Sequence, residues 1–129
     1  MIAKTLTLRL NGSTLCVRVR FDETAHIEDF ERLLTACVLH ERAMSGPDAH
    51  AAAELYGKAI EALYGLIFGS EWLRVILAWF GEEKREMVSQ INPFVIGTVI
   101  PAVRRASARQ REQAKKAFLK SQKKAVRRK

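Results

Sequence analysis

Two short runs of alternating apolar and polar residues near the N-terminus constrain the fold more than any other feature of this sequence. They occupy residues 4–21 and flank Asn11-Gly12. Asparagine and glycine both tolerate the positive φ that a two-residue hairpin turn requires, so the pattern predicts a β-hairpin with one apolar face. Because an isolated hairpin is only marginally stable in water, this face must pack on helices or join another chain.

Helical periodicity dominates the chain from the end of the hairpin to residue 103. Glycine, proline and capping residues divide this region into predicted helices at about 24–44, 48–68, 71–80 and 82–103. We expect Pro93 and Pro101 to break the last helix, because proline lacks a backbone N–H and excludes the preceding residue from helical geometry. The sequence thus predicts an α+β fold, in which an N-terminal β-hairpin packs on a small helical bundle.

The apolar residues of the second and third predicted helices indicate which sides face the core. On the second helix this side is predicted to hold Ala52, Leu55, Ala59, Ala62, Leu63 and Leu66. The third helix is apolar on nearly all sides, which is typical of a central or docking element. Its two tryptophans are seven residues apart and lie on nearly one face, where core packing and protein docking are both open. The candidate docking residues are Trp72, Ile76, Trp79 and Phe80.

Positive charge is concentrated at the end of the chain. The 129 residues carry a net charge of +8, but residues 1–103 hold ten basic and thirteen acidic side chains. Residues 104–129 hold twelve basic side chains and one acidic one, Glu112. We therefore predict an α+β domain over 1–103 and a basic, helical or disordered extension over 104–129. The basic residues of the extension are Arg104, Arg105, Arg109, Arg111, Lys115, Lys116, Lys120, Lys123, Lys124, Arg127, Arg128 and Lys129.

Such an extension has three possible roles: a solvated helix, an electrostatic arm for nucleic acid, or a segment that orders on an acidic protein. Phe118 is its one aromatic residue, which gives little support for recognition of specific bases.

The cysteine count and the N-terminus favour a cytoplasmic setting. Cys16 and Cys37 are too few for a disulfide framework, and no secretory signal is visible. Residues 87–103 are free of charge, but they include Asn92 and two prolines, so a membrane span is the weaker interpretation. We expect no membrane association.

The sequence offers no constellation for catalysis. It has no nucleophile motif, no glycine loop that cradles phosphate and no paired-cysteine zinc signature. Cys37 and His40 share one helix face, but a metal site needs three or four ligands, and Cys37 is better explained as a small core residue. The chain is therefore predicted not to be an enzyme and to need no cofactor or metal.

The order of these elements resembles that of the tail assembly chaperones of long-tailed phages. Several of their families begin with a strand, an Asn-Gly turn and a strand, as residues 6–20 do. Helices follow with a segment similar to residues 56–69, and a last amphipathic helix ends in a tail rich in lysine and arginine, here 115–129. The chain departs from this pattern in its proline-interrupted residues 91–101 and in its very basic end.

The resemblance implies a non-enzymatic, cytoplasmic protein of phage morphogenesis. Such chaperones bind the long helical tape-measure protein, keep it soluble and recruit tail-tube subunits. An apolar groove or face would cover apolar helical surface that otherwise aggregates. Exposed hairpin edges also permit self-association. The alternative hypothesis is a small nucleic-acid-associated protein that acts through its basic tail.

Overall fold

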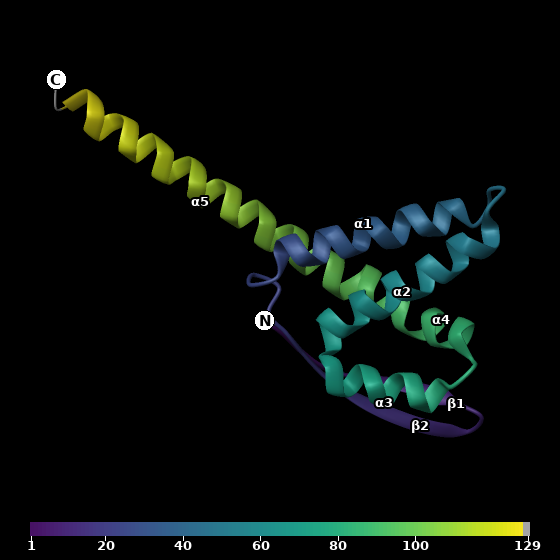
Figure 1. Ribbon diagram of the computed structural model, residues 1–129. Coiled ribbons are helices and arrows are strands. Elements are labelled where there is room, and N and C mark those ends of the chain that lie inside the picture. Colours follow the sequence, from purple (N-terminus) through teal and green to yellow (C-terminus); the bar gives the residue numbers. More distant parts are fainter. Residues whose placement is uncertain (128–129) are drawn as a thin grey trace.

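The structure, a computed structural model, describes residues 1–127 and has the predicted α+β architecture (Figure 1). Its elements are β1 (Ile2–Leu10), β2 (Ser13–Phe21), α1 (Ile27–Ala43), α2 (Ala49–Phe68), α3 (Ser70–Phe80), α4 (Lys84–Phe94), the π-helical turn η1 (Val95–Val99) and α5 (Ile100–Arg127). The helices surround the apolar face of the hairpin, and the last part of α5 projects away from the other elements.

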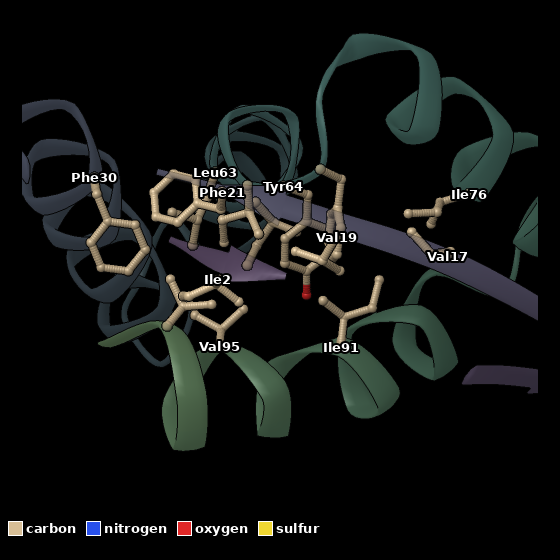
Figure 2. Packing of buried hydrophobic residues seen from close by; sticks show 14 of the residues in the cluster. Ile2, Val17, Val19, Phe21, Phe30, Leu63, Tyr64, Ile76, Ile91 and Val95 are labelled. Carbon is tan, nitrogen blue, oxygen red and sulfur yellow. The ribbon is translucent and has the colours of Figure 1, made fainter. Parts of the chain in front are cut away.

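The predicted hairpin is confirmed, with strands that pair in register from Ile2 opposite Phe21 to Leu10 opposite Ser13. Asn11 and Gly12 form the turn with φ values of 51° and 80°, as this two-residue turn requires. Alternate side chains of both strands point into the core, where they meet residues from α1, α2, α3, α4 and η1 (Figure 2). The apolar face is therefore covered by helices of the same chain.

The helix α2 lies at the centre of the packing, but its buried side differs from the predicted one. Leu55 is 47% exposed and Ala62 is also exposed, whereas Ile60 and Tyr64 are buried. The prediction is thus confirmed for Ala52, Ala59 and Leu63 and wrong for Leu55 and Ala62. Both sides of α2 are apolar, so periodicity alone did not distinguish the side that carries Tyr64 from its neighbour.

A hydrogen bond between Tyr64 and Asn92 joins α2 to α4 inside the protein. The Tyr64 hydroxyl donates to Asn92 Oδ1 at 2.7 Å, and the ring of Tyr64 packs edge-on against Phe68. Burial raises the pKa of Tyr64 above its ordinary value, so the hydroxyl keeps its proton. This contact gives the buried hydroxyl a partner, which its burial requires.

At the predicted break near the prolines, the structure has a π-helical turn, and the chain continues as a helix on both sides of it. Pro93 lies inside α4, and Pro101 is the second residue of α5. Between them, the N–H of Ile100 donates to the carbonyl of Val95, five residues back. A regular helix would press the ring of Pro101 against the carbonyl of Gly97 and leave that carbonyl without its N–H donor, and π turns commonly relieve such conflicts.

We predict that Tyr64→Phe lowers the free energy of unfolding by about 1–2 kcal/mol, because the ring remains packed but the Asn92 amide loses its partner. Urea titration of Tyr64→Phe, Asn92→Ala and the double variant would measure the coupling between the two side chains. Additive effects of the two substitutions would show that the hydrogen bond contributes nothing to stability.

Candidate functional site

The four docking candidates on α3 do not form one exposed face. Ile76 and Phe80 are 0% and 2% exposed, and Ile76 belongs to the same core cluster as Val17 (Figure 2). Trp72 and Trp79 are half-buried, and the ring of Trp79 stands edge-on to Phe80 with centroids 4.9 Å apart. The α3 tryptophans thus pack against the core, and Ile76 and Phe80 are not available to a partner.

An apolar groove of about 610 Å³ instead lies between the end of α1, the middle of α2 and the start of α4. We call it the α2/α4 groove. Its walls carry the buried side chains of Ile60 and Met87 and the half-buried ring of Tyr56. The remaining lining residues are Met44, Ala53, Gly57, Glu61, Lys84, Arg85, Val88 and Ser89.

Small residues on α2 keep the groove open. Ala53 and Gly57 are four residues apart and both line it, so two successive turns of the helix present a small residue to the groove. A Cβ atom built on Gly57 meets nothing within 4 Å. The open space beside Gly57 is therefore large enough for an incoming side chain.

Three of the lining residues are charged, namely Glu61, Lys84 and Arg85, and the others carry no charge. Burial raises the pKa of Tyr56, and the Glu41 carboxylate raises it further. Such a lining suits the binding of an apolar side chain better than it suits proton transfer. Sequence reasoning missed this site. The available signals were the pair of small residues on an apolar helix and the methionines Met44 and Met87, which adapt to different contact surfaces.

The cysteines and histidines of the described residues do not gather at one place. Cys37 is buried, as predicted for a core residue, whereas Cys16 is exposed on the hairpin. Within residues 1–127, no three His, Cys, Asp or Glu side chains lie close enough together to hold a metal ion.

The predicted boundary between residues 103 and 104 falls inside α5, which crosses it without interruption. Val103 and Ala106 are still buried, and Gln110 Nε2 donates to the carbonyl of Thr24 at 3.5 Å. We call residues 108–127 the arm, because the side chains of 108–125 are all exposed and this part of α5 projects from the body (Figure 1). The predicted basic residues Arg128 and Lys129 lie outside the described residues.

The outer edge of the hairpin is partly covered near its turn. The backbone N–H of Arg9 donates to Gln90 Oε1 at 2.8 Å, and Gln90 Nε2 donates to the carbonyl of Arg9. The amide of Gln90 thus occupies the backbone groups that another strand would use at this position of β1. Self-association through this edge remains a prediction, and this contact disfavours it at Arg9.

Within residues 1–127, no helix is long and apolar enough to cross a membrane. Comparisons of the chain with protein-family models, with curated proteins and with solved structures found no match. The groove and the arm are therefore interpreted from their own geometry and chemistry.

We predict that the two thiols differ sharply in reactivity. Exposed Cys16 should react with an aromatic disulfide reagent at pH 8 within the mixing period, whereas Cys37 should react only when the chain unfolds. Burial, with a further contribution from the Glu41 carboxylate, raises the pKa of Cys37 to about 11, which suppresses its thiolate form. The Cys16→Ser variant isolates the second thiol, and fast reaction of this variant without denaturant would contradict the prediction.

Proposed function

We propose that this protein is a non-enzymatic tail assembly chaperone that binds the tape-measure protein in the host cytoplasm during phage tail morphogenesis. The observation that carries the proposal is the α2/α4 groove, an apolar site of about 610 Å³ that opens beside the small residues Ala53 and Gly57 of α2. The order of the elements, with its N-terminal hairpin, helices and basic end, supports the same family.

The shape and chemistry of the groove suit one face of an amphipathic helix. An apolar anchor of the partner would enter beside Gly57, with Ile60 and Met87 beneath it. Glu61 and Arg85 on the lining would meet polar residues that flank the anchor. A tape-measure protein presents many similar helical turns, and flexible methionines allow one groove to accept several of them.

This role also explains why an apolar groove is tolerated on the surface. Apolar patches on long, unassembled helices cause aggregation, and a protein that covers them reversibly keeps the chain soluble until the tail tube encloses it. Recruitment of tail-tube subunits is part of the proposal and would use a surface other than the groove.

We predict that Gly57→Leu weakens binding of the tape-measure protein at least tenfold, because the new side chain fills the space that the anchor would occupy. Co-expression followed by quantification of soluble tape-measure protein, together with calorimetry on a purified fragment, would measure the effect. Leucine is a better helix former than glycine by up to about 1 kcal/mol, so the variant should fold at least as stably as the parent chain.

Ala51→Leu provides the matched control, since Ala51 is an exposed alanine of α2 that does not line the groove. Equal loss of soluble tape-measure protein with both leucine variants would exclude the groove as the binding site. No gain in soluble tape-measure protein on co-expression of the parent chain would overturn the proposed function itself.

The arm favours a second candidate function, which is electrostatic binding of nucleic acid. Its basic side chains lie on several sides of an exposed helix, and this placement fits contacts with phosphate better than the reading of bases. We expect Lys115→Glu/Lys116→Glu to weaken DNA binding and to flatten its dependence on salt, as measured by fluorescence anisotropy. Affinity that is insensitive to salt and to this double reversal would reject the hypothesis.

A further inference from the structure

The face of α5 that packs on the body continues along the arm without charge. From buried Val99, Val103 and Ala106, steps of three and four residues reach positions with no Lys, Arg, Asp or Glu. We call these positions the arm stripe, and they are Gln110, Ala114, Ala117, Phe118, Ser121 and Ala125. Every one of them is exposed, and Phe118 is 62% exposed. The arm is thus an amphipathic helix whose uncharged side lacks cover within residues 1–127.

From this arrangement we propose that the arm of one copy of this chain binds in the α2/α4 groove of a second copy, with Phe118 as its anchor. The groove is lined mainly by apolar side chains, and the arm carries an exposed aromatic side chain, Phe118. Alanine and serine on either side of Phe118 let the arm approach the groove closely, while Gly57 and Ala53 on α2 do the same from the opposite side.

Charge complementarity supports a second copy as the occupant. The arm carries eight basic residues and one acidic one, whereas residues 1–103 carry ten basic and thirteen acidic ones. The groove lining itself carries Glu61 against Lys84 and Arg85, and Glu82, Glu83 and Glu86 lie beside these two basic residues in the sequence but do not line the groove. Two arms therefore repel each other, whereas an arm and the body of another copy carry opposite net charges, which favours contact between an arm and a body.

The direction of the arm makes this contact intermolecular. The arm extends α5 away from α2 and α4 (Figure 1), and a continuous helix of 20 residues spans about 30 Å without folding back. A reciprocal exchange of arms closes into a dimer, and a one-way contact forms a chain of copies. A polyanion would use the basic side chains of the arm but leave Phe118 without a partner.

The test is sedimentation velocity of the full-length protein over a range of concentrations, after nuclease treatment and at low salt. We expect self-association that Phe118→Glu weakens at least tenfold and that high salt also weakens. Leu119→Glu is the matched control, because Leu119 is adjacent, 50% exposed and off the arm stripe, and we expect it to associate as the parent chain does. Phe118 is exposed in the arm, so its substitution leaves the core intact.

Mixing two defective variants gives the sharper result. Phe118→Glu retains the groove and Gly57→Leu retains the anchor, so each variant alone should be defective in self-association. In the mixture, the arm of Gly57→Leu can bind in the groove of Phe118→Glu, which forms one arm–groove contact. The inference is overturned if the parent chain is monomeric or if nuclease abolishes its assemblies. It is also overturned if Phe118→Glu associates as the parent chain does, or if the mixture fails to associate. Because no tape-measure protein is present, these outcomes are independent of the proposed function.

Discussion

The apolar face of the two-stranded hairpin is the constraint on which the rest of the structure depends. Two strands cannot bury such a face by themselves, so the helices must supply the other half of the core. They do so with residues from α1, α2, α3, α4 and η1, which meet Val17, Val19 and Phe21 in a single cluster. This requirement explains why side chains of the very apolar α3 are buried in the core. With Ile76 and Phe80 facing inward, α3 has no continuous exposed apolar face, and the apolar groove lies between α2 and α4.

Local chemistry made the hairpin and the helix positions predictable, whereas contacts between distant residues determined the orientation of the helices. Asn11 and Gly12 specify the turn by their own backbone preferences, and Gly69 and Gly81 separate helices with positive φ values of 88° and 58°. The buried side of α2 carries Tyr64, whose hydroxyl donates to Asn92, 28 residues away, and no periodic pattern contains that contact. The groove escaped prediction for the same reason, since Gly57 becomes informative only when α4 is placed beside it.

The prolines show how a correct local rule leads to an incomplete picture. Proline does disrupt the regular helix, but the disruption is absorbed by η1, where the backbone widens and then resumes as α5. The basic segment is therefore attached to the body through a continuous helix whose residues Ala102, Val103 and Ala106 are buried. The positive charge that the sequence places in a separate extension thus has a fixed direction relative to the groove.

That fixed direction connects the two proposals made above. If the arm of one copy fills the groove of another, a helix of the tape-measure protein, the client of the proposed chaperone, must displace it. Both helices would use the space beside Gly57. Self-association then lowers the concentration of free grooves, and only clients that bind more tightly than the arm are retained. The salt-sensitive part of the arm contact comes from its lysines and arginines, while a client anchor needs only the apolar walls. The segregation of acidic body and basic arm would in this way set a threshold for client binding without any change in the fold.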